Sequence, residues 1–288
     1  PTAISAASRS RTAASAGRRP ISSANSGADL APDEDARPQR EDVNRARTAG
    51  DGRPLLPSFG RRHGRRLSEH KKALLTRVLA QCAIAPPQDS ACFAPHTAFD
   101  RPVRDIWLEI GFGAGEHLAG QALTHRDIGF IGCEPYINGV AALSARIEGL
   151  DLDNIRIFAD DARLLLPHLP SACLGRVFLL FADPWPKVRH ANRRLVARPT
   201  LDALARLLRP GGTFVFASDH PGYVRWTLWH ASRHPAFAWK ARGPQDWRQP
   251  PPDWIETRYE AKAKAAGSLC TYLEFLRTNT DAVAARSG

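Results

Sequence analysis

The feature that most constrains the fold is an alternation of apolar runs and helical segments that begins near residue 103. Runs rich in Val, Ile, Leu and Phe are typical of strands buried on both faces, and the segments between them have helical periodicity. This pattern predicts a doubly wound α/β sheet. The expected strands cover 104–113, 127–134, 154–160, 175–183 and 211–219, and the expected helices cover 115–125, 138–149, 162–169 and 198–208. A last strand, 269–277, follows a long loop and is expected to add in antiparallel fashion.

The chain before this domain divides into two parts. Residues 1–60 are rich in Ser, Ala, Arg, Pro and Gly and lack apolar periodicity, so we expect a disordered basic tail. Residues 61–100 should hold a helix that begins after Ser68, a suitable N-cap, and a linker. The α/β domain then covers 101–280. The first 28 residues carry arginines and no acids, as organellar transit peptides do, which is an alternative to a cytoplasmic location.

Charge and cysteine usage narrow the class of partner and compartment. The formal net charge of +11 favours a polyanionic partner such as nucleic acid, although a solvated basic tail has the same composition. No apolar stretch approaches the roughly 20 residues that span a bilayer, so no membrane association is expected. The five cysteines are scattered and form no C-x-x-C pair, which indicates free thiols in a reducing compartment such as the cytoplasm.

Acidic residues stand at the end of every predicted strand of the alternating region. Ligands of open α/β sheets bind beyond the carboxyl ends of the strands, so these acids should share one site. They are Glu109, Glu134, Asp160 with Asp161, Asp183 and Asp219. A glycine loop follows the first strand at Gly111, Gly113 and Gly115; alone, such a loop is weak evidence. With an acid about 20 residues later that can bind ribose hydroxyls, it predicts a nucleoside ligand.

The charge around the glycine loop favours S-adenosylmethionine over NAD. A pyrophosphate is repelled by carboxylates and prefers a bare helix N-terminus. Here Glu109 precedes the loop and Glu116 follows it. This surrounding suits a ligand that carries a cationic sulfonium and ammonium. Asp161 is expected to accept a hydrogen bond from the adenine amino group.

Several motifs together resemble one family, the class I, S-adenosylmethionine-dependent tRNA (guanine-N7)-methyltransferases. They are "RRHGRRLSE", "LEIGFGAGEHL", "GCEPYINGVAAL", "NIRIFADDA", "FADPWPKVRHANRRL", "GGTFVFASD" and "TRYEAKAKAAG", which span roughly residues 60–277 in the family's order. The resemblance implies a Rossmann-like methyltransferase fold with a mostly parallel seven-stranded sheet. It also implies methyl transfer to N7 of guanosine 46, in the variable loop of tRNA, by a monomer or a homodimer.

The same resemblance assigns site residues by matching position. For the methyl donor they are Glu109, Gly111, Gly113, Gly115, Glu134, Asp161, Ala162 and Asp183. For the substrate nucleoside they are Lys187, Asp219, Thr257, Arg258, Tyr259 and Glu260. Asp183 is the expected catalytic residue, and Arg189, Arg193 and Arg194 are expected to contact the RNA backbone. No metal is expected, because His96, His117, His125 and His168 show no metal-ligand pattern and are taken as surface or packing residues.

The residues also predict how the chemistry proceeds. N7 of guanine has a free lone pair, so alignment and stabilisation of the charge that develops on the purine are the main tasks. Asp183, which follows a strand and precedes Pro184, is the first candidate for the second task. Asp219 or Glu260 should read the guanine edge, which offers two donors. Trp185 is expected either to stack on the base or to brace the loop.

Four residues depart from the family pattern: Ala182, where proline is usual, and Arg258, Tyr259 and Lys262, which replace Lys, Phe and Arg. An Arg fork differs in geometry from a Lys, so contacts there are open. Alternative functions are an exocyclic-amino methyltransferase, a non-catalytic RNA-binding protein with a vestigial cofactor fold, and an NAD-dependent dehydrogenase. The single proline of "DPW" and the basic residues that follow it speak against the first.

Overall fold

The computed structural model describes residues 59–86 and 92–279, all within the unit that spans residues 43–288. The disorder predicted for residues 1–60 therefore falls outside the described residues, apart from Phe59 and Gly60. The predicted N-terminal helix is confirmed as α1 (Glu69–Cys82). The Ser68 side chain caps it by accepting a hydrogen bond from the Lys71 N–H.

The described residues form one seven-stranded sheet, as expected, and its strand order is β3-β2-β1-β4-β5-β7-β6. Its strands are β1 (Asp105–Ile110), β2 (Ile128–Cys133), β3 (Ile155–Phe158), β4 (Leu174–Leu180), β5 (Leu208–Ser218), β6 (Phe237–Trp239) and β7 (Thr271–Arg277). The first five strands pair in parallel, whereas β7 is antiparallel to β5 and to β6. The predicted antiparallel addition is thus confirmed. The order reverses between β1 and β4, where such sheets bind ligands.

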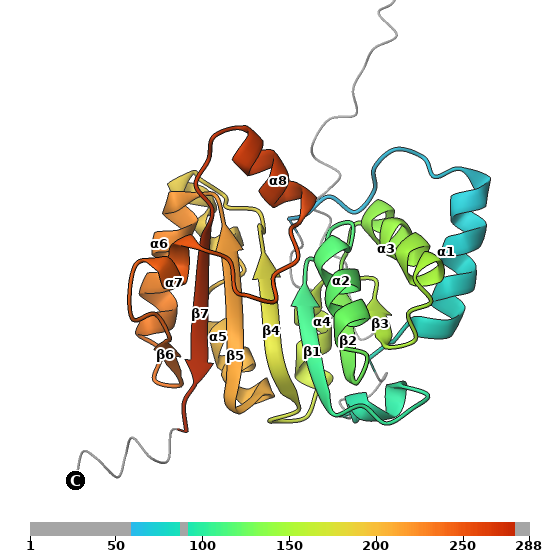
Figure 1. The fold of residues 1–288 in the computed structure, drawn as a ribbon, viewed down its shortest axis with the longest axis horizontal. Helices are drawn as coiled ribbons and strands as arrows, with labels where there is room; N and C mark the ends of the chain where they lie inside the picture. The colour runs from blue at the N-terminus through green and yellow to red at the C-terminus, as the bar shows by residue number, and fades with distance from the viewer. Residues whose placement is uncertain (1–58, 87–91, 280–288) are drawn as a thin grey trace, which may run out of the picture. The chain divides into compact units, whose positions relative to one another are not determined.

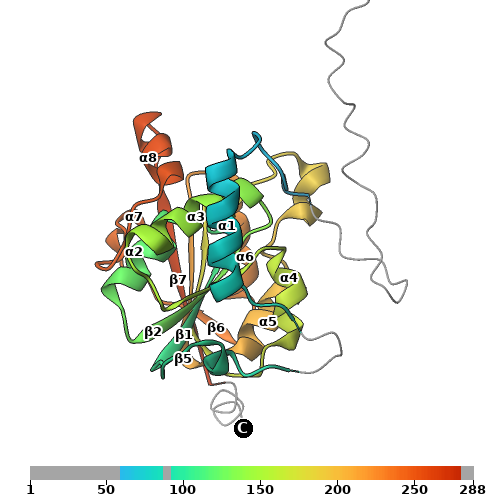
Figure 2. The same ribbon diagram turned by 90° about the vertical axis from the view of Figure 1, so that its right-hand side faces the viewer.

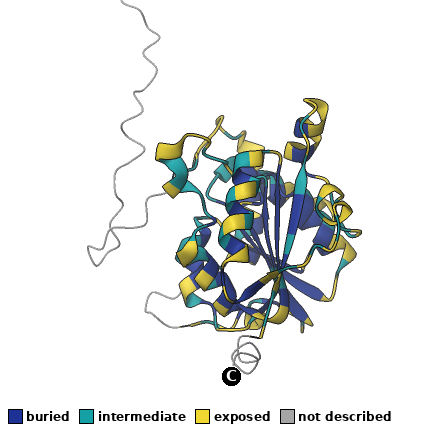
Figure 3. Cartoon of the chain, turned by 90° about the vertical axis from the view of Figure 1, so that its left-hand side faces the viewer, coloured by how far each residue is buried: buried dark blue, intermediate teal, exposed yellow. Residues whose placement is uncertain are grey.

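Helices lie on both faces of the sheet (Figures 1 and 2). The α-helices after α1 are α2 (Glu116–Thr124), α3 (Ile137–Gly149), α4 (Ala162–Leu165), α5 (Arg198–Leu207), α6 (Pro221–Ser232), α7 (Gln245–Arg248) and α8 (Arg258–Ala265). The 3-10 turns are η2 (Pro95–Ala98), η3 (Leu166–His168) and η4 (Val188–Arg193). One apolar cluster joins α1, α2 and α3 to β2 and β3, and another joins α4, α5 and α6 to the opposite face. The strands are almost entirely buried between these layers (Figure 3).

Two strands differ from their predicted bounds for backbone reasons. The strand predicted to run to Asp183 ends at Leu180, because Phe181 adopts a left-handed φ of 50° that breaks the extended chain. The strand predicted from Gly211 begins at Leu208, and its pairing with β4 shifts register between Leu174 and Arg176. Neither change moves Asp183 or Asp219 away from the carboxyl edge.

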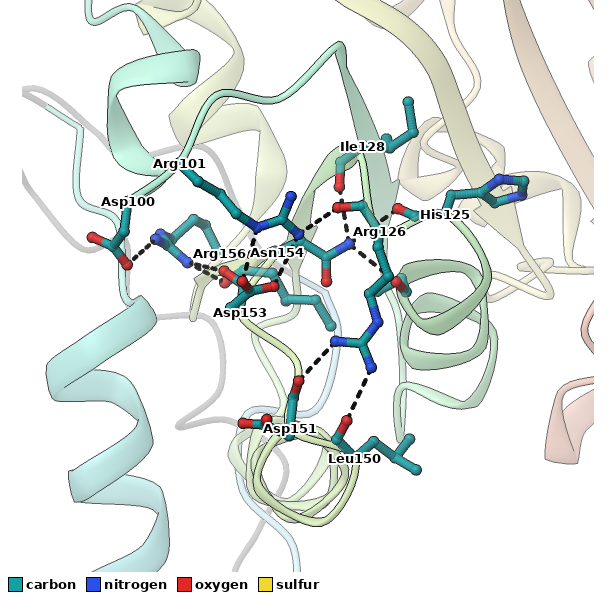
Figure 4. Close-up of polar contacts among 12 residues, drawn as sticks. Asp100, Arg101, His125, Arg126, Ile128, Leu150, Asp151, Asp153, Asn154 and Arg156 are labelled. Carbon is teal, nitrogen blue, oxygen red and sulfur yellow. Dashed lines mark hydrogen bonds and ion pairs between the residues drawn. The ribbon is translucent and has the colours of Figure 1, made fainter.

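A polar network closes the opposite, amino-terminal edge of the sheet (Figure 4). The buried Asn154 side chain donates to the carbonyls of Ala122, His125 and Ile128 at 3.0–3.1 Å. Around it, Arg101 pairs with Asp153 at 2.8 Å and Arg156 with Asp100 at 3.1 Å. These contacts join the start of β2 to the loop before β3. This network therefore lies at the end of the sheet opposite the predicted site.

Candidate active site

The glycine loop after β1 is shaped by close backbone packing. Gly113 has a φ of 58°, in the left-handed region that favours glycine. At Gly139, in the first turn of α3, an added Cβ would lie 2.2 Å from the Gly113 carbonyl oxygen. Only a glycine at 139 lets α3 approach the loop this closely.

Glu134 fixes the loop from the end of β2. Its Oε2 accepts a hydrogen bond from the Gly113 N–H at 2.8 Å, and its Oε1 accepts one from the Tyr136 N–H at 2.9 Å. Burial raises the pKa of Glu134, these two N–H groups oppose the rise, and the carboxylates of Asp183 and Glu109 add to it. Because Asp183 and Glu109 both act on Glu134, acids from three strand ends lie close enough to interact electrostatically.

Glu109 is almost fully buried, with 3% exposure. Its Oε2 lies 2.7 Å from Nδ1 of His117, which is also buried at the start of α2. His117 was expected to be a surface or packing residue, and its hydrogen bond to a predicted donor-site acid was not foreseen. No local pattern reveals it, because the two residues lie on different elements.

Asp161 caps α4 and binds Arg163, which was not predicted to belong to the site. Its Oδ1 accepts hydrogen bonds from the Arg163 N–H and Nε, both at 3.0 Å, and its Oδ2 lies 2.6 Å from Arg163 Nη2. The carboxylate faces a cavity together with this guanidinium. Contact with an adenine amino group would use the remaining lone pairs of Asp161.

The cavity beside these acids measures about 170 Å³. Predicted site residues that line it are Gly111, Asp161, Ala162, Asp183 and Arg193. Unpredicted lining residues include Phe59, Gly60, Cys133 and Tyr223. Ligand pockets usually measure about 300–1,000 Å³, so a nucleoside-sized ligand must extend beyond this cavity or widen it. A larger cavity of about 500 Å³ under residues 239–252 holds none of the predicted site residues, so size alone does not locate the site.

The loop that carries Asp183 is held in an uncommon conformation. Phe181 and Trp185 have φ values of 50° and 42°, and such strain is often found at functional sites. Asp183 itself is exposed and lies between them. The Arg193 guanidinium lies 5.0 Å from the Trp185 ring and 4.8 Å from the Phe59 ring. Trp185 therefore braces the loop here, one of the two roles expected for it.

The basic side chains that follow Asp183 divide into two groups. Lys187, expected to contact the nucleoside, and Arg189, expected to contact the RNA backbone, are exposed. Arg194 instead donates to the carbonyls of Pro184 and Trp185 at 2.9 and 3.1 Å, and its guanidinium lies 4.8 Å from the Trp226 ring. Its donors are thus used within the protein to hold the Asp183 loop.

Helix α8 reaches over the glycine loop (Figure 1). A Cβ on Gly113 would come within 3.0 Å of the Tyr259 ring, and Arg258 Nε lies 2.6 Å from Glu116 Oε1. Burial raises the pKa of the Tyr259 hydroxyl, and the charges of Glu134 and Asp183 add to the rise. Arg258 and Tyr259, which depart from the family pattern, therefore contact the start of α2 and the glycine loop.

Glu260 and Asp219 differ sharply in exposure. Glu260 has 0% exposure. Its carboxylate accepts hydrogen bonds from Trp254 Nε1 at 2.6 Å and from the Tyr272 hydroxyl. It also forms an ion pair with Lys264 at 2.7 Å. Asp219 is exposed at the end of β5. Both carboxylates raise the pKa of the nearby Cys270 thiol, although burial is the larger cause. Both acids therefore lie near Cys270.

The described residues contain no group of three His, Cys, Asp or Glu side chains able to hold a metal ion. No helix in the described ranges is long and apolar enough to cross a membrane.

A doubly wound sheet with a glycine loop after β1 and acids at successive strand ends fits a methyltransferase domain. In agreement, a family model described as "Putative methyltransferase" matches residues 103–272, more than half of the chain. Curated relatives specify the family further. A tRNA (guanine-N(7)-)-methyltransferase of Rhodospirillum rubrum is 49% identical over 76% of this chain and 87% of its own length.

A second relative of the same name, from Nitrobacter hamburgensis, is 46% identical over 78% of this chain and 88% of its own length. The chain therefore belongs to the tRNA (guanine-N(7)-)-methyltransferase family. Among solved structures, the 16S rRNA methyltransferase KamB is similar with a TM-score of 0.46 and 17% identity, over 64% of this chain and 91% of that one.

Proposed function

We propose that this protein transfers a methyl group from S-adenosylmethionine to N7 of guanosine 46 in the variable loop of tRNA. The observation that carries the proposal is the convergence of Glu134, Asp161 and Asp183 on the sheet's reversal point, in a chain of this family. We expect it to act in the cytoplasm, as a monomer or a homodimer.

The residues present fit the proposed methyl donor. S-adenosylmethionine would supply an electrophilic methyl group on a cationic sulfonium, and it also carries an ammonium. The carboxylates of Asp183 and Glu109 both add to the raised pKa of Glu134, whose main cause is burial, so three acids lie near one another at the glycine loop. Such a concentration of negative charge favours a cationic ligand and disfavours a pyrophosphate, which argues against the NAD alternative.

The protein's own contribution would be alignment and charge stabilisation. Fixing two reactants in a productive orientation can supply about 7–11 kcal/mol of the barrier. Asp183 is exposed at the mouth of the cavity, on a loop held by Arg193 and Arg194. We assign it the role of stabilising the positive charge that develops on the purine ring as N7 is alkylated.

Recognition of guanine is assigned to Asp219 rather than Glu260. A carboxylate can accept hydrogen bonds from the guanine N1–H and N2–H₂ together, whereas adenine presents an acceptor at N1. Glu260 has both carboxylate oxygens bonded within the protein and no exposure. Asp219 is the exposed member of the pair. We therefore expect Glu260 to hold the 257–260 segment in place rather than to contact the base.

Two basic surfaces support tRNA as the substrate. The first comprises Lys187 and Arg189 beside Asp183. The second is a hollow of about 830 Å³ before α1, whose basic lining is Arg61, His63, Arg65, Arg66 and Lys71. Among the described residues, none of these five side chains has a carboxylate partner. Unpaired cations on this scale suit phosphate contacts along an RNA backbone.

The test is transfer of a labelled methyl group from S-adenosylmethionine to unmodified tRNA, followed by nucleoside analysis. We expect 7-methylguanosine, with a loss of about a hundredfold or more in rate for Asp183→Ala. The control variant is Asp127→Asn, which changes a surface acid at the amino-terminal edge of β2 and should keep full activity.

Other outcomes separate the alternatives. A methylated exocyclic amine would indicate the exocyclic-amino reaction. Binding of tRNA without binding of the donor would indicate a non-catalytic RNA-binding protein.

A further inference from the structure

We propose that His117 is a positioning residue of the donor site, which orients the Glu109 carboxylate and links it to the segment that carries α8. The inference rests on the proposed function, because it concerns how the same site holds its methyl donor. His117 does not line the cavity and would act through its two neighbours.

The first link is the hydrogen bond between His117 and Glu109. The two side chains are 0% and 3% exposed, and His117 Nδ1 lies 2.7 Å from Glu109 Oε2. A carboxylate can only accept, so Nδ1 must carry the proton and donate it. The other carboxylate oxygen, Oε1, has no donor among the described residues. One oxygen of Glu109 is thus held by the protein. Glu109 does not line the cavity, so the proposed methyl donor would reach the other oxygen beyond it.

Within the described part of the chain, the bond to Glu109 is the only polar contact of the His117 imidazole. Nε2 of His117 is buried and has no hydrogen-bond partner among the described residues. Burying a polar nitrogen without a partner is unfavourable, and an apolar side chain of similar size would avoid the penalty. A histidine at this place is therefore explained better by its bond to Glu109 than by packing.

The second link runs from the imidazole to α8. The His117 ring packs on the Trp254 ring with 5.1 Å between centroids, and on its other neighbour, Phe178, at 4.7 Å. Trp254 Nε1 in turn donates to Glu260 at 2.6 Å. The Glu260 N–H bonds the Thr257 hydroxyl at 3.1 Å. The His117 imidazole thus contacts both Glu109, at the end of β1, and Trp254, whose indole is hydrogen-bonded to the predicted substrate segment.

This arrangement predicts that His117 sets the affinity for the donor more than the rate of the chemical step. The decisive experiment measures the dissociation constant of S-adenosylhomocysteine by calorimetry, on the full chain. Two variants are compared, each with its melting temperature. His117→Asn keeps a donor at the δ position, where Nδ1 stands, and His117→Leu removes it. Both are also made in a Glu109→Ala background.

We expect His117→Leu to weaken binding by about tenfold or more, in line with loss of a hydrogen bond to a charged group. His117→Asn should recover most of that affinity. In the Glu109→Ala background the same histidine changes should have little effect, because their action passes through Glu109. If the leucine variant unfolds, His117→Gln, whose amide sits at the ε position, takes its place.

Two results would overturn the inference while leaving the proposed function intact. One is unchanged affinity in a folded His117→Leu protein. The other is an equal loss with and without Glu109, which would mean that the ring matters only for packing. If the unmodified protein binds neither S-adenosylmethionine nor S-adenosylhomocysteine, the proposed function itself fails.

Discussion

Glu134 shows how one buried acid can serve both the backbone and a ligand. Each of its oxygens accepts one backbone N–H, which leaves further lone pairs for ribose hydroxyls. Burial raises the pKa of its carboxyl above the ordinary 4.5. The folded state therefore binds this proton more tightly than the unfolded state, and ionised Glu134 destabilises the fold as pH rises through its raised pKa.

The raised pKa of Glu134 predicts how binding of the methyl donor depends on pH. A protonated Glu134 loses acceptor capacity, so donor affinity should fall as pH drops, and the fall should begin above pH 4.5. Glu134→Gln should bind the methyl donor weakly and show no such fall with pH, and it should lose one of the two backbone hydrogen bonds, because an amide has a single acceptor oxygen. Calorimetric titrations from pH 8 to pH 5 test this. A parent profile identical to that of the variant would contradict it.

Asp219 and Glu260 give a second prediction at the scale of single residues. Asp219→Asn should raise KM for tRNA about tenfold or more, because the amide presents a donor to the guanine N1–H. It should leave the affinity for S-adenosylhomocysteine and the melting temperature unchanged. Glu260→Gln should instead lower the melting temperature, because three bonds to its carboxylate are weakened.

A Glu260→Gln protein of normal stability that loses guanine selectivity would make Glu260 the base-reading residue.

Among the elements, the network at the amino-terminal edge of the sheet tests what holds the fold. Asn154 is 1% exposed and its amide donates to three carbonyls (Figure 4). Asn154→Ala should lower the free energy of unfolding by about 2–3 kcal/mol, because these buried acceptors lose their donor.

The neighbouring residue supplies the matched control. Asp153 makes an exposed ion pair with Arg101, so Asp153→Asn should lower the free energy of unfolding by less than about 1 kcal/mol. Urea denaturation of both variants compares them directly. Equal losses would show that the buried amide is no more important than the surface pair.

The elements that could be predicted from the sequence are those with a strong apolar pattern. Strands β1 to β5 are buried on both faces, so their runs of Ile, Leu, Val and Phe are visible in the sequence. The helices α6, α7 and α8 were not predicted. α6 begins at Pro221 behind an unusual cap, the His220 side chain, and α8 has only two buried residues, Glu260 and Ala263. Their positions depend on tertiary contacts.

The site shows the same division. The acids at the strand ends follow from topology, since parallel strands bring their carboxyl ends to one edge. The partners of those acids do not. His117 and Arg163 were not selected, because which side chain bonds Glu109 or Asp161 depends on rotamers and packing. Likewise, Phe59 reaches the cavity from a segment whose composition gave no sign of structure.

At the scale of the whole molecule, charge is distributed according to function. The net charge of +11 coexists with a cluster of acids around the cavity, so the surface attracts RNA while the site attracts a cation. Electrostatic binding to phosphates weakens as salt is added, and each phosphate that a cation neutralises contributes about 0.7–0.9 to the slope of log affinity against log salt concentration.

Salt dependence therefore tests the two basic surfaces. Lys187→Ala with Arg189→Ala, and separately Arg65→Ala with Arg66→Ala, should each flatten the salt dependence of tRNA binding without affecting S-adenosylhomocysteine binding. Arg101→Ala, which removes a cation at the far edge of the sheet, should not. Deleting residues 1–58 should also flatten the slope if the tail's arginines contact RNA. Slopes unchanged in all the site-side variants would contradict both surfaces.

We propose N7 of guanosine 46 as the atom that is methylated. The most direct measurement compares tRNA with a tRNA that carries 7-deazaguanosine at position 46, where a C–H replaces N7 and the rest of the base is kept. We predict undiminished tRNA binding, no methyl transfer to the substituted tRNA, and 7-methylguanosine from the normal one. Methyl transfer to the 7-deazaguanosine tRNA at the normal rate would show that another atom or another nucleotide is the substrate.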